Sequence, residues 1–367
     1  MTSSGTTSVI VAPTAFKGTL GPSAVAGAMA AGVAAVWPAA EVVQRPLSDG
    51  GNGLLEAWVA MHGGVLETVE VMGPMGSPTR ASFLRAGSTA VVESAEACGL
   101  HLIPAGRRDP LRATTRGVGE LLRAAVRGGA SEIILGLGGS GTVDGGAGMA
   151  RALGWRLLDA AGRELEPGGG ALVHLRSVQP PRDGLESRVV ALCDVENPLV
   201  GPRGAARIFG PQKGARPDEV ALLEEGLCRL AVVQEADLGL ALADLPGAGA
   251  AGGLGAGARA FLGAELVQGA PWMIERAGIR ELMERADLII TGEGRFDAQS
   301  AMGKVTGRIV DAARSAGVRV LLVCGRVDGP IPPGVEAVDA GGRALDEQDL
   351  ARLTEGACRG LAGGDRL

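Results

Sequence analysis

The sequence predicts an α/β protein with two domains, and three observations indicate this class. Strand-like and helix-like stretches alternate at both ends of the chain, which is the pattern of a parallel sheet. Between about residues 66 and 100 the pattern changes to that of an antiparallel meander, which marks a second structural unit. With 367 residues, of which 46 % are hydrophobic, the chain is long enough to bury two cores.

The N-terminal residues predict the first strand, helix and strand of the parallel sheet. The strands cover about 9–12 and 41–46, and an Ala-rich helix covers about 23–36 between them. Ligands of such sheets lie beyond the carboxyl ends of the strands, where this chain has Lys17 and Asp49. Asp49 has a second interpretation, as the N-cap of the helix that follows SDGGNG.

The central region predicts a unit with strands of mixed direction. Extended runs at 66–72, 80–86 and 89–94 form the meander, and an amphipathic helix at 114–127 follows it. One or two hairpins are expected over 155–178, where polar turns separate short apolar runs. The three histidines, His62, His101 and His174, have no spaced partners and are interpreted as surface or packing residues.

The densest motif is EIILGLGGSGTVDGGAGM at 132–149, which we interpret as strand, anion-binding loop and helix. Glycines allow backbone N–H groups to approach an anion closely, and the helix that begins near Gly146 adds its positive N-terminal end. The candidate phosphate-binding residues are Gly138, Gly139, Ser140, Thr142 and Asp144. A simple strand-to-helix turn is the alternative, but a carboxylate in an anion loop favours an intervening metal ion or substrate hydroxyl.

Two further segments carry polar groups on short loops. The strand in SRVVALCDVENPLVG leads to Asp194 and Asn197, a combination that presents a metal or sugar hydroxyl, although a turn at Asn-Pro explains part of it. The loop RIFGPQKGA contains Arg207, Gln212 and Lys213, and basic and amide groups on such backbone suit a phosphate or a carboxylate.

A second glycine-rich loop, LPGAGAAGGLGAGARAF at 245–261, enters another predicted helix. Its candidate phosphate-binding residues are Gly249, Gly252 and Gly253. Residues 286–367 then return to the alternation of strand and helix. The first strand of this region ends in a charged cluster made of Glu293, Arg295, Asp297 and Lys304. Such a cluster suggests a ligand site, with mutually paired surface charges as the alternative.

Lysine is scarce in this chain, which draws attention to the lysines that remain. Of 35 basic residues only Lys17, Lys213 and Lys304 are lysines, and each is adjacent to a glycine. Asparagine is similarly restricted to Asn52 and Asn197. Because arginine serves nearly everywhere else, a remaining lysine indicates a position that needs a compact, mobile ammonium group.

Composition excludes several classes of function. A net charge of −6, a pI near 5.3 and an aromatic content of 2 % argue against nucleic-acid binding. No apolar run reaches the roughly 18 residues of a membrane span, and the N-terminus lacks the basic region of a secretory signal. The five cysteines are widely spaced without a CxxC pair, which argues against a zinc site or a disulfide framework. A cytoplasmic protein with small-molecule partners is expected.

Phosphoryl transfer is the chemistry that these residues suit best. It requires cations around the phosphate, a carboxylate-held Mg²⁺, an anion-binding backbone and a carboxylate near the acceptor hydroxyl. No stretch fits GxxxxGK[ST], so a P-loop kinase is excluded. An NAD(P)-dependent oxidoreductase of a small hydroxy acid is the alternative, because GxGxxG occurs at Gly136 and again at Gly247. A third class, a non-catalytic sugar-acid or nucleotide-binding module, does not need both lysine-bearing and acid-bearing loops.

The motifs also resemble those of a known family. APTAFKGTL, PLSDGGNG, TTRGVGEL, GLGGSGTVDGGAG, ALCDVENPLVG, FGPQKGA, PGAGAAGGLG and ITGEGRFDAQSAMGK occur in the order seen in the bacterial glycerate kinase family of the GarK/GlxK type, the glycerate 2-kinases. The resemblance implies ATP-dependent phosphorylation of D-glycerate to 2-phosphoglycerate. It further implies a flavodoxin-like parallel-sheet domain from residues 1–65 and 285–367, with an inserted mixed α/β domain at 66–284.

The same resemblance implies roles for individual residues. Lys17, Asp49, Asp194, Lys213, Glu293 and Lys304 match charged motif positions of the family, and the first four are the expected catalytic residues. The sequence departs from the family pattern at Thr14, Ala15, Asn52 and Val143. The loss of two acids near the first two loops leaves Asp49 as the carboxylate expected there to orient the acceptor hydroxyl.

The expected cofactors are ATP and Mg²⁺. Asp194, with Glu293 or Asp297, is expected to coordinate Mg²⁺, while Lys17 and Lys213 neutralise carboxylate or phosphate charge. Lys304 and the backbone of both glycine loops are expected to hold the nucleotide phosphates. The remaining expected substrate contacts come from Gly50, Gly51, Asn197, Arg207, Gln212 and Arg295. The sequence leaves open the 2- or 3-phosphate product, the D or L substrate, the loop that binds ATP, and whether the protein is a monomer or homodimer.

Overall fold

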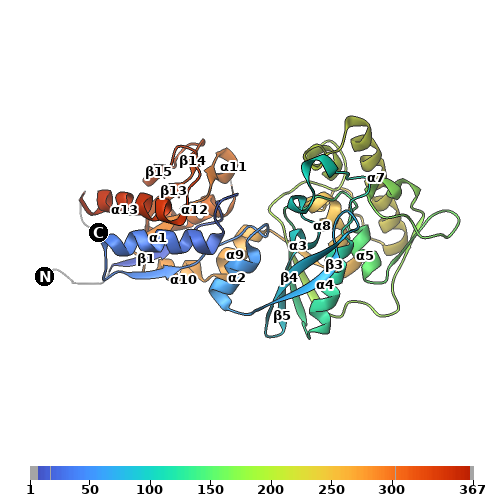
Figure 1. The fold of residues 1–367 in the computed structure, drawn as a ribbon, viewed down its shortest axis with the longest axis horizontal. Coiled ribbons are helices and arrows are strands. Elements are labelled where there is room, and N and C mark those ends of the chain that lie inside the picture. The colour runs from blue at the N-terminus through green and yellow to red at the C-terminus, as the bar shows by residue number, and fades with distance from the viewer. Residues whose placement is uncertain (1–6, 17, 302, 364–367) are drawn as a thin grey trace. The chain divides into compact units, whose positions relative to one another are not determined.

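The structure is a computed structural model that describes residues 7–16, 18–301 and 303–363. Lys17, for which the sequence predicts a catalytic role, lies outside the described residues. The chain forms two compact units. Unit 1 comprises Met1–Asp49, Glu56–Gly63 and Gly269–Leu367, and unit 2 comprises Gly50–Leu55 and Gly64–Gln268 (Figure 1).

Unit 1 is built on a five-stranded parallel sheet in the order β2-β1-β11-β13-β15. The strands are β1 (Ser8–Val11), β2 (Glu41–Gln44), β11 (Leu288–Thr291), β13 (Arg319–Cys324) and β15 (Val335–Asp339). This is the flavodoxin-like order, which confirms the parallel α/β class predicted for both ends of the chain. The order reverses between β1 and β11, so ligands of unit 1 are expected beyond the carboxyl ends of these two strands.

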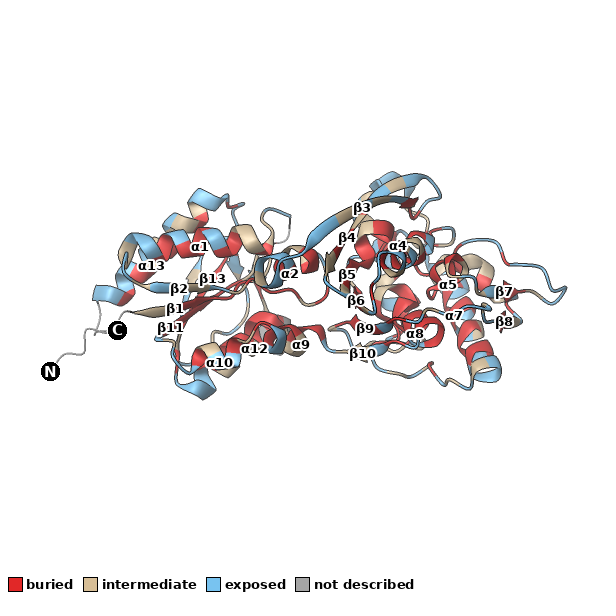
Figure 2. Cartoon of the chain, turned by 90° about the horizontal axis from the view of Figure 1, so that it is seen from below, coloured by how far each residue is buried: buried red, intermediate tan, exposed pale blue. Residues whose placement is uncertain are grey.

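Helices cover both faces of this sheet. Figure 2 shows α1 (Pro22–Val36) and α13 (Glu347–Gly363) on one face and α9 (Gly269–Arg276), α10 (Ile279–Met283) and α12 (Val305–Ala316) on the other. All four residues of β11 are buried, as expected for a strand covered on both sides. The remaining elements of this part are α2 (Leu54–His62), whose first two residues belong to unit 2, α11 (Ala298–Ala301), β12 (Arg295–Phe296) and β14 (Arg326–Val327).

Unit 2 contains a six-stranded mixed sheet in the order β3-β4-β5-β6-β9-β10. The strands are β3 (Val65–Met72), β4 (Pro78–Ala86), β5 (Thr89–Glu93), β6 (Glu132–Gly136), β9 (Arg188–Leu192) and β10 (Glu265–Val267). The pairs β3–β4 and β4–β5 are antiparallel, which confirms the predicted meander, and the strands from β5 to β10 are parallel. A short antiparallel pair, β7 (Arg156–Leu158) and β8 (Ser177–Gln179), confirms one predicted hairpin.

The helices of unit 2 pack around a large apolar core. They are α3 (Ser94–Cys98), α4 (Arg116–Arg127), α5 (Ala147–Ala152), α6 (Ala205–Phe209), α7 (Pro217–Leu238) and α8 (Ala250–Leu262), with short 3₁₀ turns η1 (Leu100–Leu102), η2 (Ala105–Arg107), η3 (Gly169–His174) and η4 (Pro211–Lys213). Fully buried Leu121, Ile133 and Leu135 lie in this core. Among the described residues, no helix is both long and apolar enough to span a membrane.

The register of the strands in unit 2 places the ends of three strands at one edge of the sheet. Glu93, Gly136 and Leu192 are the last residues of β5, β6 and β9, and they are aligned across the sheet. The loops that leave these strands therefore start from the same edge. This is the carboxyl edge at which parallel sheets bind ligands.

Candidate functional site

A pocket of about 490 Å³ lies at this edge of unit 2. Its polar lining consists of Asn52, His101, Arg108, Ser140, Gln212 and Lys213. Its apolar lining includes Leu100, Leu137, Val195, Phe209 and Ala251, and Gly138 and Gly139 expose backbone to it. None of the described residues that line this pocket is acidic. The pocket therefore has the charge and the donor groups expected of a site for a small anion.

The glycine loop after β6 reaches the pocket because it packs against the segment around Gly50 and Gly51. A Cβ atom on Gly138 would lie 2.6 Å from the Cα atom of Gly51, and one on Gly136 would lie 2.4 Å from the carbonyl oxygen of Gly50. These contacts leave no room for a side chain at either position. Packing of backbone on backbone thus explains the first two glycines of the GxGxxG match.

The second glycine loop also has a packing role. A Cβ atom on Gly252 would lie 2.0 Å from the carbonyl oxygen of Thr142, and one on Gly249 would lie 2.2 Å from that of Pro198. The backbone nitrogens of Gly249 and Gly253 donate to carbonyl groups of the protein. Gly252 and Gly253 therefore pack against the first glycine loop, and Gly249 packs against the segment at Asn197 and Pro198; phosphate binding by these three glycines stays a prediction.

Lys213 joins the loop RIFGPQKGA to the glycine loop after β6. Its side chain is 3 % exposed, and Nζ donates to Oγ of Ser140 at 2.8 Å and to the carbonyl oxygen of Thr142 at 2.7 Å. Burial lowers the pKa of Lys213 to about 8, while the nearby carboxylate of Asp144 acts in the opposite direction. The structure thus brings together Gly138, Gly139, Ser140, Gln212 and Lys213, as the sequence suggested for these residues.

The carboxylate of Asp144 is buried and is held by hydrogen bonds from the protein itself. Its side chain is fully buried and accepts hydrogen bonds from the backbone nitrogens of Thr115, Gly146 and Gly148 and from the hydroxyl of Thr115. Burial raises its pKa, and these hydrogen bonds oppose that shift. The carboxylate therefore fixes the turn into α5 and the start of α4, in contrast to the expected contact with a ligand.

Three polar residues of the pocket lining, Asn52, His101 and Arg108, were not among the site residues predicted from the sequence. Arg108 lines the pocket, and its guanidinium donates to the carbonyl oxygen of Gln212 at 3.3 Å. His101, interpreted from the sequence as a surface or packing residue, is exposed and also lines the pocket. Nothing in the sequence separates Arg108 from the many other arginines, because it lies in an irregular segment without a strand or glycine motif beside it.

Other predicted residues of unit 2 have partners outside the pocket lining. The side-chain amide of Asn197 donates to the carbonyl oxygen of Arg203 at 2.7 Å, which stabilises a local turn. Nε of Arg207 lies 3.6 Å from the carboxylate of Glu224, and the arginine side chain is exposed whereas Glu224 is buried. Asp194 follows Cys193 after the end of β9 and is partly exposed. Asn197 and Arg207 thus take part in local structure, and their substrate contacts stay predictions.

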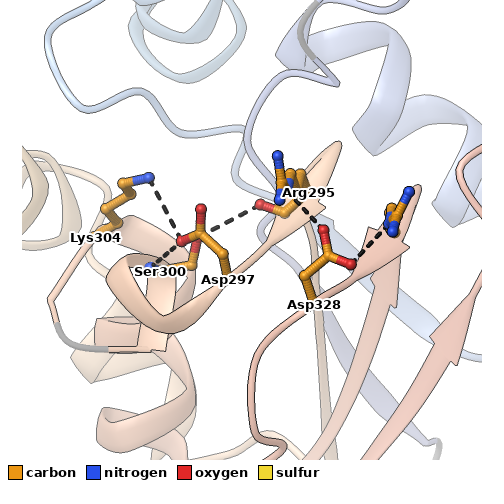
Figure 3. A network of polar contacts seen from close by, with 6 residues as sticks. Arg295, Asp297, Ser300, Lys304 and Asp328 are labelled. Atoms are coloured by element: carbon orange, nitrogen blue, oxygen red, sulfur yellow. Dashed lines mark hydrogen bonds and ion pairs between the residues drawn. The ribbon is translucent and has the colours of Figure 1, made fainter.

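In unit 1 the predicted charged cluster forms after β11. Nζ of Lys304 lies 4.0 Å from Oδ1 of Asp297, and this carboxylate also accepts a hydrogen bond from the backbone nitrogen of Ser300 at 3.0 Å (Figure 3). Nε of Arg295 lies 2.7 Å from Asp328. Lys304 is the N-cap residue of α12, and the first turn of a helix has backbone N–H groups without partners in the helix.

Glu293 is the group of this cluster that best suits a cation. Its Oε1 atom is buried without a hydrogen-bond partner. Burial raises the pKa of Glu293, and hydrogen bonds from Thr306 and Ser300 together with the nearby Lys304 oppose this shift. No group of three or more metal-ligating side chains occurs among the residues that the structure describes. A site of one or two carboxylates completed by phosphate oxygens and water, as Mg²⁺ commonly adopts, fits these residues.

The remaining predicted positions are divided between the two units. Asp49 is a residue of unit 1. Helix α2 begins at Leu54, so Asp49 is not its N-cap; instead, the carboxylate of Glu93 accepts a hydrogen bond from the nitrogen of Leu55 at 2.9 Å. Lys213 belongs to unit 2 and Lys304 to unit 1.

Comparison with known proteins identifies relatives over most of the chain. The model of the glycerate kinase family matches residues 9–342. Glycerate kinase from Bacillus subtilis (strain 168) is 45 % identical over 327 residues, which cover 87 % of this chain and 85 % of that protein. Glycerate 2-kinase from Escherichia coli (strain K12) is 43 % identical over 324 residues, which cover 86 % and 84 % respectively.

A solved structure shows the same fold. A crystal structure assigned to glycerate kinase 2 from Salmonella typhimurium LT2 is 36 % identical to this chain and has a TM-score of 0.86. The match covers 99 % of this chain and 100 % of that one.

Proposed function

The chain belongs to the glycerate kinase family, and from this we propose that it transfers the γ-phosphoryl group of ATP to the 2-hydroxyl of D-glycerate. The observation that supports this best is the basic, acid-free lining of the pocket in unit 2. A three-carbon hydroxy acid carries one carboxylate and two hydroxyls, which match cationic and amide donors. The oxidoreductase alternative has no comparable support, because packing explains the glycines of its motif.

Arg108 is the group proposed to bind the carboxylate of glycerate. A guanidinium stays protonated at any physiological pH and presents donors in the planar geometry that a carboxylate requires. The amides of Asn52 and Gln212 line the same pocket and can bind the hydroxyls. Gly139 allows Asn52 to approach closely, since a Cβ atom there would lie 2.5 Å from Oδ1 of Asn52.

The charged cluster of unit 1 is proposed to hold the nucleotide. Lys304 and the start of α12 supply positive charge for phosphate oxygens. Glu293 and Asp297 would hold Mg²⁺, which neutralises charge on the transferred phosphoryl group when bound. Asp49, Asp194 and Lys17 keep the roles predicted from the sequence as part of this proposal. A reaction that uses ATP, together with five free cysteines, is consistent with a cytoplasmic protein.

The test is a coupled assay with ATP, Mg²⁺ and D-glycerate, in which the wild type should form ADP and phosphoglycerate. Arg108→Gln should raise the KM for glycerate on the order of tenfold or more, the scale of a lost charged hydrogen bond, with little change in the KM for ATP. Lys304→Gln should do the reverse. Arg107→Gln is the matched control, because Arg107 is an exposed neighbour outside the pocket lining.

Two further measurements complete the test. Phosphorus NMR of the product distinguishes the 2-phosphate from the 3-phosphate. Thermal denaturation with ATP or with NAD(H) separates the two classes of enzyme, since the cognate cofactor raises Tm. Absence of phosphorylation, combined with stabilisation by NAD(H), would overturn the proposal.

A further inference from the structure

We propose that Ser140 and Lys213 form a proton relay that removes the proton of the acceptor hydroxyl during phosphoryl transfer. The proposal rests on the proposed kinase function and adds to it the group that takes the proton. It differs from the role expected for Lys213 from the sequence, which was neutralisation of substrate charge. Under the relay, Lys213 acts in its neutral form.

The geometry of Lys213 suits a proton acceptor. Its Nζ atom lies 2.8 Å from Oγ of Ser140 and 2.7 Å from the carbonyl oxygen of Thr142. A neutral amine can donate one proton to the carbonyl oxygen and direct its lone pair at the hydroxyl of Ser140. The carbonyl oxygen of Thr142 can only accept a hydrogen bond, so an N–H group of Lys213 must point at it, and the lone pair of the amine is left to face Ser140. Ser140 lines the pocket and can in turn accept a hydrogen bond from a bound substrate hydroxyl.

The composition of the pocket leaves few other proton acceptors. Kinases commonly use a carboxylate here, yet among the pocket residues that the structure describes none is acidic. The guanidinium of Arg108 cannot lose a proton at physiological pH. His101 is exposed to solvent, unlike the buried Ser140 and Lys213. Ser140 with Lys213 is the remaining pair that is both buried and hydrogen-bonded.

The charges around Lys213 also suit a base that works near neutral pH. Burial lowers its pKa to about 8, and two groups face it, Cys98 from the end of α3 and Asp144 from the glycine loop. Burial raises the pKa of the Cys98 thiol to about 12, so the thiol is neutral. Asp144 partly offsets the effect of burial on Lys213. A catalytic base is most effective when its pKa lies near the working pH.

In the proposed step, phosphoryl transfer to glycerate is coupled to proton transfer to Lys213. The hydroxyl oxygen of glycerate forms a bond to the γ-phosphorus, and the bond from this phosphorus to the β,γ-bridging oxygen breaks, which releases ADP. The hydroxyl proton moves to Oγ of Ser140 as the proton of Ser140 moves to Nζ of Lys213. The resulting ammonium group returns its proton to water after product release.

The first experiment measures kcat against pH for the full-length wild type, Ser140→Ala and Ser140→Thr. In the wild type, kcat should rise with pH and level off above an apparent pKa near 8. Ser140→Ala should lose on the order of 10²-fold or more in kcat, the scale of one acid–base group. Ser140→Thr keeps the hydroxyl and should recover much of the loss, which a purely structural role for Ser140 would not predict.

The second experiment separates a base from a fixed charge. Lys213→Ala is assayed with added ethylamine or with tetramethylammonium, which carries a charge but no transferable proton. The relay predicts recovery of kcat in proportion to the concentration of unprotonated ethylamine and none with tetramethylammonium. Recovery that follows total cation concentration would assign Lys213 to charge neutralisation and overturn the relay.

Two controls keep the outcomes distinct. Circular dichroism and Tm show whether each variant is folded, and Ser140→Thr supplies the test if Lys213→Ala is not. Asp49→Asn examines the carboxylate predicted from the sequence. If Asp49→Asn abolishes the rise of kcat with pH while Ser140→Ala retains that rise, Asp49 is the base and the relay is wrong. A wild type without glycerate phosphorylation would instead refute the proposed function itself.

Discussion

Thr115 donates two hydrogen bonds to the same oxygen of Asp144, one from its backbone nitrogen at 2.8 Å and one from its hydroxyl at 2.9 Å. The hydroxyl also accepts a hydrogen bond from the nitrogen of Met149 at 3.0 Å. The pair thus joins the start of α4 to the start of α5 through groups that have no access to water. The shape of the glycine loop between β6 and α5 depends on this buried junction.

Replacement of Asp144 by Ala should therefore be strongly destabilising. It leaves several buried N–H groups and one hydroxyl without an acceptor, and we expect a loss of roughly 3 kcal/mol or more in the free energy of unfolding. Asp159→Ala is the matched control, because Asp159 accepts similar backbone hydrogen bonds in an exposed turn. Urea denaturation of both variants checks this, and equal losses would contradict the assigned role of Asp144.

Gly252→Ala should damage both stability and activity. A Cβ atom there would lie 2.0 Å from the carbonyl oxygen of Thr142, which holds Lys213, and φ is +73°. Gly263→Ala has a similar φ of +65° but open space around the new Cβ atom. The control should lose about 1 kcal/mol from its backbone conformation alone. Gly252→Ala should lose clearly more and should also lower kcat, measured by denaturation and by the kinase assay.

Ala251 should respond to substitution in the opposite direction from an ordinary helical alanine. It is the one non-glycine residue with a positive φ in the described part of the chain, at 52°, and it lines the pocket. Glycine relieves a strain of about 1 kcal/mol there, which offsets its greater entropy in the unfolded chain. Ala251→Gly should leave the free energy of unfolding unchanged or slightly higher, whereas Ala124→Gly in the regular helix α4 should lower it by about 1 kcal/mol.

The fold could be predicted from the sequence where periodicity and composition carry the information. The strands at 132–136 and 288–291 are apolar runs followed by glycine, and both form as predicted. The meander was visible in its turns and alternation. Hydrophobic pattern is a local signal, so the elements and their type follow from it.

The site was less predictable because it depends on contacts between distant segments. The sequence does not show whether Gly252 binds a phosphate or packs on Thr142, and the fold shows that it packs. Arg108 has no distinguishing neighbour in the sequence and reaches the pocket through its packing beside Gly214. Lysine scarcity did identify Lys213, because that signal depends on residue choice and not on the path of the chain.

The buried carboxylate of Glu93 predicts a dependence of stability on pH. Burial raises its pKa from the usual 4.5 to about 7, and the backbone N–H groups of Gly53, Leu54 and Leu55 only partly oppose this shift. Because the folded-state pKa is higher than the unfolded one, the contribution of Glu93 to stability is fully present below pH 4.5 and is lost as the pH rises to about 7. The loss amounts to about 3 kcal/mol for a shift of this size.

Glu93→Gln isolates this effect. The amide keeps an oxygen that accepts a hydrogen bond from the nitrogen of Leu55 but cannot ionise, so it should not share the loss. The stability of Glu93→Gln relative to the wild type should therefore increase by a few kcal/mol as the pH rises from 4.5 to 8. Glu132→Gln, in which an exposed surface pair is altered, should show no such trend. Parallel curves for Glu93→Gln and wild type in urea denaturation across this range would mean that Glu93 is as well solvated as a surface carboxylate, in conflict with its burial.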